Sequence, residues 1–212
     1  VLNVLKTLKS HSDKVRFVCD PVFGDNGKLY VPEALVDIYR NEVIPIANVC
    51  TPNQFEVEQL TGISIKTLDD AIRACIALHD LGPELVVITS LILSDNKNDK
   101  VITILASERV TLEENGTTTT QDRLYCIDTP ILKGSYTGTG DLFAALFLAW
   151  TAREPNNLPL ALEKVVSTMH SVIKNTMGKY DGTVKSKELR LIQSKNAIED
   201  PPLGIFKARK IL

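Results

Sequence analysis

The residues with the clearest chemical potential form the run Gly138-Thr139-Gly140-Asp141, which directly precedes the apolar stretch 142–150. Two glycines at the point where a loop becomes a helix let the backbone approach a ligand closely, because no Cβ intervenes. The first N–H groups of a helix have no intrahelical partner, and the helix dipole adds partial positive charge there. We therefore predict that this helix start binds an anion such as a phosphate.

Asp141 adds an acid to the first turn of the same helix. Beside a bound phosphate, its carboxylate can accept a proton from an attacking hydroxyl, which indicates a small-molecule kinase. A plain loop followed by an N-terminal helix acid gives the same four residues, and this alternative stays open. The run is not a dinucleotide-binding fingerprint, whose third glycine would fall at Phe143, and the chain contains no P-loop sequence.

The composition excludes several classes of protein. The 212 residues are 44% hydrophobic with a net charge of −2, which gives no reason to expect a nucleic-acid partner. The longest apolar run, 142–150, is too short to span a bilayer, so no membrane segment is expected. Four widely spaced cysteines (Cys19, Cys50, Cys75 and Cys126) lack C-x-x-C spacing and predict buried thiols in a reducing cytoplasm.

The chain begins with Val1 rather than Met, and its first residues already carry an amphipathic pattern. Val1, Leu2, Leu5 and Leu8 fall on one face of a helix, so this helix is expected to pack against something. The sequence thus suggests a fragment, a truncated isoform or an incomplete gene model.

Two acids follow the first predicted strand, 15–19. Asp20 ends the strand and Asp25 lies five positions later, with turn-forming residues between them. At the carboxyl end of a parallel strand, such acids face the crevice in which open α/β sheets bind ligands. Carboxylates there suit Mg²⁺ and its hydration shell. The competing interpretation is that Asp20 caps a turn and Asp25 is simply solvated.

A second group of polar residues follows the next predicted strand, 46–50. Pro52 ends that strand, and Asn53 is a suitable cap for a helix over 54–60 that Gly62 terminates. Glu56 stands at the spacing of a capping box. The functional alternative is that Asn53 and Glu56 both reach into the crevice of Asp20, toward metal and phosphate.

The remaining pattern predicts helices over 32–43, 67–81, 158–177 and about 186–198, with a last strand in 205–212. The run 85–89 is a fully apolar strand, typical of a buried parallel sheet, and it ends at Thr89-Ser90. The helix that begins at Gly140 is apolar nearly all round, so we expect it to be buried in the middle of the protein.

Two further strands, 101–106 and 124–127, have no helix between them. They flank a polar segment, 113–122, in which Asn115-Gly116 is a hairpin-turn signal. These features predict antiparallel edge strands and a flap near the nucleotide.

The motifs together carry a resemblance. DPVFGDNGKLYVPE (20–33), TPNQFEVEQLTG (51–62), VVITS (86–90) and GTGDLFAALFLAW (138–150) resemble the ribokinase-like superfamily. The blocks 155–172 and 188–201 favour the pyridoxal kinases within it. The resemblance implies an α/β fold, a three-layer α/β/α arrangement with a mostly parallel central sheet and antiparallel edge strands. It also implies that 1–212 is a single kinase domain, the carboxy-terminal two thirds of the family's chain without its first strands.

The resemblance implies roles for individual residues. Asp141 matches the base that deprotonates the 5′-hydroxyl of pyridoxal, and Gly138, Thr139 and Gly140 match the anion hole. The positions matching nucleotide-binding residues are Asp20, Asn53, Thr89, Ser90, Thr129, Pro130, Ile131, Leu132, Thr139 and Gly140. The positions matching residues near the metal ions are Asp20, Asp25, Thr51, Glu56 and Thr89. The cofactors implied are ATP, Mg²⁺ and a monovalent cation, K⁺ or Na⁺.

The resemblance implies phosphorylation of pyridoxal, pyridoxine and pyridoxamine in vitamin B6 salvage, by a cytoplasmic homodimer with no nucleic-acid or membrane partner. Two alternatives remain. One is a truncated isoform that binds nucleotide without catalysis, and the other is a related hydroxymethylpyrimidine or sugar kinase. The family's additional amino-terminal third holds most of the vitamin pocket. Without it, a sheet edge and an apolar helix face would be left uncovered.

Overall fold

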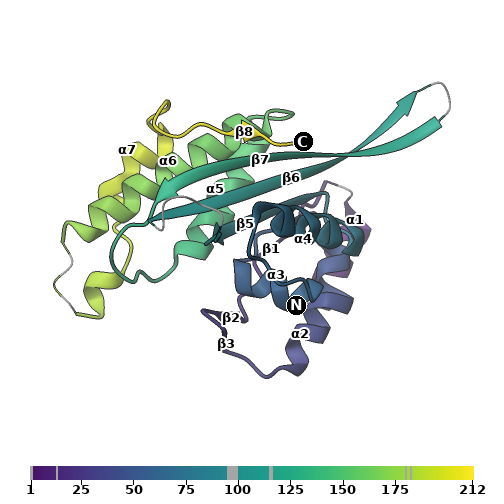
Figure 1. The fold of residues 1–212 in the computed structure, drawn as a ribbon, viewed down its shortest axis with the longest axis horizontal. Helices are drawn as coiled ribbons and strands as arrows, with labels where there is room; N and C mark the ends of the chain where they lie inside the picture. The colour runs from purple at the N-terminus through teal and green to yellow at the C-terminus, as the bar shows by residue number, and fades with distance from the viewer. Residues whose placement is uncertain (1, 13, 95–99, 115–116, 180, 182) are drawn as a thin grey trace.

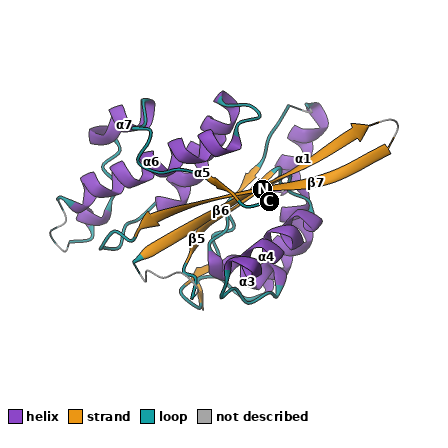
Figure 2. Ribbon diagram, turned by 45° about the horizontal axis from the view of Figure 1, so that its top comes forward, coloured by secondary structure: helices purple, strands orange, loops and turns teal. Residues whose placement is uncertain are grey.

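The computed structural model describes residues 2–212 except 13, 95–99, 115–116, 180 and 182. A six-stranded sheet lies between two groups of helices (Figures 1 and 2). Its first three strands run parallel and its last three antiparallel, which confirms the predicted mixed α/β fold. The strands, in their order across the sheet, are β1 (Val18–Cys19), β4 (Val49–Cys50), β5 (Leu85–Leu91), β6 (Val101–Glu114), β7 (Thr117–Pro130) and β8 (Arg209–Lys210).

The helices form the two outer layers. One layer consists of α2 (Ala34–Ile38), α3 (Gln54–Thr61) and α4 (Leu68–Leu81), and the other of α5 (Thr139–Arg153), α6 (Leu158–Met177) and α7 (Lys195–Glu199). The smaller elements are α1 (Leu2–His11), the hairpin of β2 (Gly24–Asp25) and β3 (Lys28–Leu29), a π-helix (Tyr39–Val43) and three 3₁₀ helices (Ile44–Ile46, Lys185–Lys187 and Ile192–Ser194).

The central strand β5 explains why helices cover both faces of the sheet. Successive side chains of a strand point to opposite faces. Val86 and Ile88 enter a core with α3 and α4, whereas Leu85 and Val87 enter a second core with α5 and α6. A strand that is apolar at four successive positions, 85–88, therefore needs a helical layer on each side.

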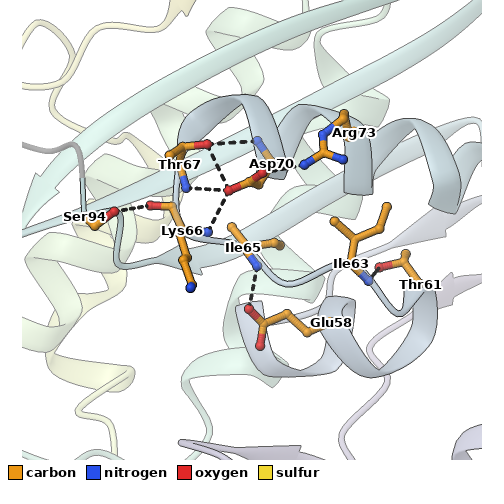
Figure 3. Close-up of polar contacts among 9 residues, drawn as sticks. All are labelled: Glu58, Thr61, Ile63, Ile65, Lys66, Thr67, Asp70, Arg73 and Ser94. Atoms are coloured by element: carbon orange, nitrogen blue, oxygen red, sulfur yellow. Dashed lines mark hydrogen bonds and ion pairs between the residues drawn. The ribbon is translucent and has the colours of Figure 1, made fainter.

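Capping residues fix the helix ends where the sequence predicted them. Gly62 ends α3 in the left-handed conformation, with φ of 72°. Thr67 caps α4, since its hydroxyl accepts a hydrogen bond from Asp70 N (3.3 Å) and the Asp70 carboxylate accepts one from Thr67 N (3.0 Å). Figure 3 shows this reciprocal pair beside Arg73, which forms an ion pair with Asp70.

Several predicted elements are shorter or broken in the structure. The helix expected over 32–43 is a five-residue α-helix that continues as a π-helix. The strands expected over 15–19 and 46–50 contain two residues each, the second because Pro45 lies in a 3₁₀ helix before it. The helix expected over 186–198 is interrupted, since the backbone of Glu188 is extended and bridges to Thr137.

The hairpin of β6 and β7 is longer than predicted. Its strands pair over fourteen residues, but β5 pairs only with positions 103–108 and β8 only with 125–126. The described parts beyond, 109–114 and 117–122, form an arm that leaves the body of the molecule (Figure 1). The expected flap near the nucleotide is therefore wrong, because this segment lies at the opposite end of β7 from Thr129. The predicted Asn115-Gly116 turn lies outside the described residues.

Helix α5 is not enclosed on all sides, contrary to the prediction. Its buried face carries Phe143, Leu146, Phe147 and Trp150, whereas Leu148 remains 37% exposed. The reason is that α5 packs on the sheet and on α6 but has an open outer side. None of the ten residues of α1 is buried either.

The sheet also has an open side at β1. Among the described strands, β1 pairs with β4 alone. A hollow of about 630 Å³ lies beside it, lined by Phe17, Asp20, Tyr39 and further side chains of α1 and the π-helix.

Candidate active site

The Gly138–Asp141 run forms the start of α5, as predicted. Gly138 is the N-cap in the left-handed conformation, with φ of 84°, and its carbonyl accepts the first helical bond, from Leu142 N (3.0 Å). The amides of the first turn consequently point out of the helix start without intrahelical acceptors. Asp141 lies in this first turn, so its carboxylate belongs to the same turn as these amide donors.

Asp20 lies against this helix start. A Cβ added at Gly140 would lie only 2.9 Å from Asp20 Oδ2, so glycine is what permits the approach. Thr51 donates a hydrogen bond to Asp20 Oδ1 (3.2 Å), while the buried Oδ2 has no hydrogen-bond partner among the described residues. Burial raises the pKa of Asp20; the Thr51 bond opposes this rise, and the charge of Asp141 adds to it.

Glu56 is buried next to the same group. It is 3% exposed and accepts hydrogen bonds from Phe23 N (3.2 Å) and Asn53 N (2.9 Å). Asn53 in turn accepts one from Glu56 N and donates to Gly24 O. Burial raises the pKa of Glu56 to about 7 and the charge of Asp20 adds to the rise, although the Asn53 and Phe23 amides oppose it. Asn53 and Glu56 therefore form the capping box, and the charge of Asp20 also acts on the Glu56 carboxylate.

A cavity of about 270 Å³ opens beside Thr139 and Gly140. The strand end Thr89-Ser90 and the Thr129–Leu132 segment lie at this cavity, as the sequence suggested. Ile131 is 39% exposed and is not among the described residues that line it. The predicted nucleotide contacts that do line it are Thr89, Ser90, Thr129, Pro130, Leu132, Thr139 and Gly140.

The remaining wall of the cavity was not identified from the sequence. It is mostly apolar and includes Phe143 from α5 together with Val166, Met169 and Ile173 from α6. These α6 residues belong to the helix's apolar stripe, which has the same spacing whether it packs on a core or lines a cavity. His170 also lines the cavity, and its ring packs edge-on against Phe206.

Asp25 is set apart from the other acids. It lies in the β2–β3 hairpin and accepts hydrogen bonds from the backbone and side chain of Asn26. It lines a separate hollow of about 350 Å³ that shares Ser90 and Ile102 with the main cavity. Among the residues that the structure describes, no three His, Cys, Asp or Glu side chains are grouped closely enough to hold a metal ion by themselves.

Within the described part of the chain, no helix has the length and apolar character needed to cross a membrane. All four cysteines are buried and free.

Sequence comparison places these features in a known family. Residues 1–185 match the family described as phosphomethylpyrimidine kinase. The chain is 42% identical to pyridoxal kinase of Dictyostelium discoideum, over 100% of this chain and 70% of that protein. It is 39% identical to the human pyridoxal kinase, over 97% of this chain and 69% of that protein.

Solved structures give the same result. Pyridoxal kinase from Leishmania donovani in complex with ADP and pyridoxamine superimposes with a TM-score of 0.80 at 30% identity. The match covers 100% of this chain and 70% of that one, so the chain spans about two thirds of the length of such relatives. This protein belongs to the phosphomethylpyrimidine kinase family, and within it to the pyridoxal kinases.

Proposed function

We propose that this protein transfers a phosphoryl group from ATP to the 5′-hydroxyl of pyridoxal, pyridoxine or pyridoxamine, as a single kinase domain. The observation that carries the proposal is the cavity that ends at the start of α5, with Asp141 in the same turn. Relatives that share this architecture are pyridoxal kinases, and the Leishmania enzyme is solved with ADP and with pyridoxamine or pyridoxine.

The nucleotide would lie in the 270 Å³ cavity. Its apolar wall from α5 and α6 suits the base, and the hydroxyls of Thr89, Ser90 and Thr129 suit the polar part of the nucleotide. Thr139 and Gly140 at the cavity's end direct the phosphates toward the free amides of α5. These amides would stabilise the charge of the transferring phosphoryl group without reorganising.

Asp141 is the proposed base. Phosphoryl transfer needs in-line positioning and charge stabilisation more than covalent chemistry, so one carboxylate near the acceptor hydroxyl suffices to remove its proton. The carboxylate of Asp141 lies over Gly138, next to the amides that would hold the phosphate.

Mg²⁺ fits the acids beside α5. Asp20 offers a buried oxygen without a hydrogen-bond partner among the described residues, and Glu56, which is bonded to Asn53, is close enough to feel the Asp20 charge. Because the described side chains do not form a complete cage, the ion would take further ligands from water and the nucleotide, as Mg²⁺ usually does. Bound there, Mg²⁺ would neutralise phosphate charge. As part of the same proposal, we assign Thr51 and Thr89 to the monovalent cation, K⁺ or Na⁺, and Asp25 to the surroundings of the phosphates and cations.

The cellular setting is also proposed. Four free, buried thiols suit a reducing cytoplasm. A homodimer is proposed from the family resemblance.

The deciding experiment measures phosphorylation of pyridoxal by this chain with Mg·ATP and K⁺. We expect turnover in the wild type and none in Asp141→Asn, whose ATP affinity should stay within about twofold because the amides and the cavity are unchanged. Retained turnover in Asp141→Asn would remove the residue from its role. ATP binding without turnover in the wild type would instead favour a non-catalytic nucleotide-binding protein.

Hydroxymethylpyrimidine should be tested in parallel, because the family description names a pyrimidine kinase. Faster phosphorylation of the pyrimidine than of pyridoxal would overturn the acceptor assignment while leaving the kinase assignment in place.

A further inference from the structure

The chain that follows α6 returns to the phosphate loop. Thr137 N donates a hydrogen bond to Lys187 O (3.1 Å), and Thr137 and Glu188 form an isolated parallel bridge. Thr137 directly precedes Gly138, the N-cap of α5. The backbone at 187–188 therefore supports the residue from which the anion-binding turn begins.

Thr176 holds this returning segment in place. It is fully buried in the last turn of α6, donates to Val172 O (2.8 Å) and accepts a hydrogen bond from Arg190 N (3.1 Å). A β-branched residue has few rotamers, and both bonds of the hydroxyl fix the one it adopts. The contact joins the end of α6 to residues 187–190, and these residues join Thr137.

The same turn of α6 also reaches the nucleotide cavity, through Ile173. The end of α6 thus contacts the cavity wall directly and the phosphate loop indirectly.

We propose that Thr176 is a positioning residue for phosphoryl transfer. Its hydroxyl fixes segment 187–190, which in turn fixes Thr137 and the start of α5. This inference rests on the proposed kinase function. Groups that stabilise a transition state must be held to within about 0.5 Å, so loss of a support behind the loop lowers the rate even though Thr176 touches no reactant.

The test compares Thr176→Val with Thr168→Val. Thr168 is fully buried in the same helix and donates to Lys164 O and to Ala197 O, so it also ties α6 to the carboxy-terminal segment. Its contact lies at α7, away from Thr137. Valine replaces threonine with nearly the same shape and removes only the hydroxyl in both variants.

We expect Thr176→Val to lower kcat by about tenfold or more, with the KM for ATP within about twofold, because the cavity that binds the base is intact. Thr168→Val should keep kcat within about twofold of the wild type, and Thr176→Ser should restore it because serine retains the hydroxyl. Equal kcat losses in the two valine variants would overturn the proposal.

A second measurement does not depend on turnover. Amide hydrogen exchange, read residue by residue by NMR, should accelerate at Thr137 and Leu142 in Thr176→Val and remain unchanged there in Thr168→Val. Unchanged exchange at both amides would refute the positioning role, even if the wild type proved inactive as a kinase. Should Thr176→Val fail to fold, Arg190→Pro removes the amide that donates to Thr176 Oγ1 and so breaks the same contact from the other side. It should then lower kcat in the same way, and an unaltered kcat would equally contradict the proposal.

Discussion

Gly140 and Asp20 show how closely two elements can approach when one side chain is absent. Gly140 lies in the first turn of α5, where alanine is normally preferred by about 1 kcal/mol. Here a Cβ would contact the oxygen of Asp20 that has no partner among the described residues. The helix start therefore uses a residue that is poor for helix stability and suited to bringing a carboxylate beside the amides that we propose bind an anion.

Gly140→Ala should separate stability from activity. We expect the free energy of unfolding to change by less than about 1 kcal/mol, because helix propensity gains while the Asp20 carboxylate must shift. Turnover should fall at least about a hundredfold, since Asp20 can no longer approach the turn that we propose binds phosphate. Urea unfolding and steady-state kinetics on the same preparation measure the two effects. Full activity in a stably folded variant would mean that the approach has no role in phosphoryl transfer.

At this scale, residue type and position at strand ends suggested Asp20, Asn53 and Glu56 as one group, with a plain capping box as the alternative, and only the family resemblance added Thr51. The cavity wall from α6 was not predicted, because an apolar stripe looks the same on a core-facing and on a ligand-facing helix. Whether a stripe lines a cavity depends on what the opposite elements leave open, and that information is not local in the sequence.

The starts of α3 and α4 are two versions of one capping motif. Asn53 with Glu56 and Thr67 with Asp70 both form complete capping boxes. They differ in their surroundings. Burial raises the pKa of Glu56 to about 7, whereas backbone hydrogen bonds from Lys66 and Thr67, together with Arg73, hold the pKa of Asp70 well below its ordinary value (Figure 3). The first box thus destabilises its charge and the second stabilises it.

This difference predicts a pH dependence. Because folding raises the pKa of Glu56 from 4.5 to about 7, the folded state binds more protons than the unfolded state between these values. Stability should therefore fall as pH rises from about 4.5 to about 7, by up to about 3 kcal/mol for this group. Glu56→Gln should remove that part of the slope, although it also loses one amide contact, which costs about 1–3 kcal/mol at all pH values.

Asp70→Asn is the matched control. Asp70 is ionised in both the folded and the unfolded state above about pH 5, given its lowered pKa in the fold. The variant should consequently reduce stability without altering the slope between pH 5 and 7. Urea unfolding without Mg²⁺ at four pH values measures all three proteins, and parallel slopes for the wild type and Glu56→Gln would contradict the raised pKa.

Among the elements, those with sharp end signals were predicted well. Gly62 marks the end of α3 in the sequence and Thr67 the start of α4, and the structure has these helix ends there. The prediction of one helix over 186–198 was wrong. The bridge from Glu188 to Thr137 is a long-range contact that overrides local helix propensity, and local sequence does not reveal it.

For the whole molecule, the arm of β6 and β7 is the feature furthest from the site. Within the described strands, residues 109–114 and 117–122 pair only with each other. Arg109 bonds to Asp122 and to Asp80 of α4 where the arm leaves the body. Beyond that point the described strand residues are largely exposed, so the arm adds little buried surface to the fold.

Shortening the arm should leave the fold intact. Leu112 and Thr119 are paired in register, two pairs away from Glu114 and Thr117, so replacing residues 113–118 with Asn-Gly keeps the alternation of the ladder and closes a two-residue hairpin turn. We expect the free energy of unfolding to change by less than about 1 kcal/mol and nucleotide affinity to be unchanged. Leu105→Ala, at a fully buried position of β6, should lose about 2–5 kcal/mol and serves as the sensitivity control. A comparable loss in the shortened protein would mean that the arm packs on the body.

The length of this arm was not predictable from alternation of apolar residues, because Thr117 to Gln121 are polar on both faces. The β-branched threonines favour a strand, but an uninterrupted polar run is equally typical of a loop. The layered α/β architecture, in contrast, follows from the runs of apolar strand residues and the helices between them.

The order of the strands has a consequence for biosynthesis. Among the described strands, the order across the main sheet is the order along the chain, from β1 to β8. During synthesis each new strand therefore meets an edge formed by its predecessor and never has to insert between two strands already paired. Such a sheet can be assembled in the direction of translation, one strand at a time. The turn that we propose binds phosphate is synthesised only after five of these strands, and the Thr176 support that we propose for it follows later still.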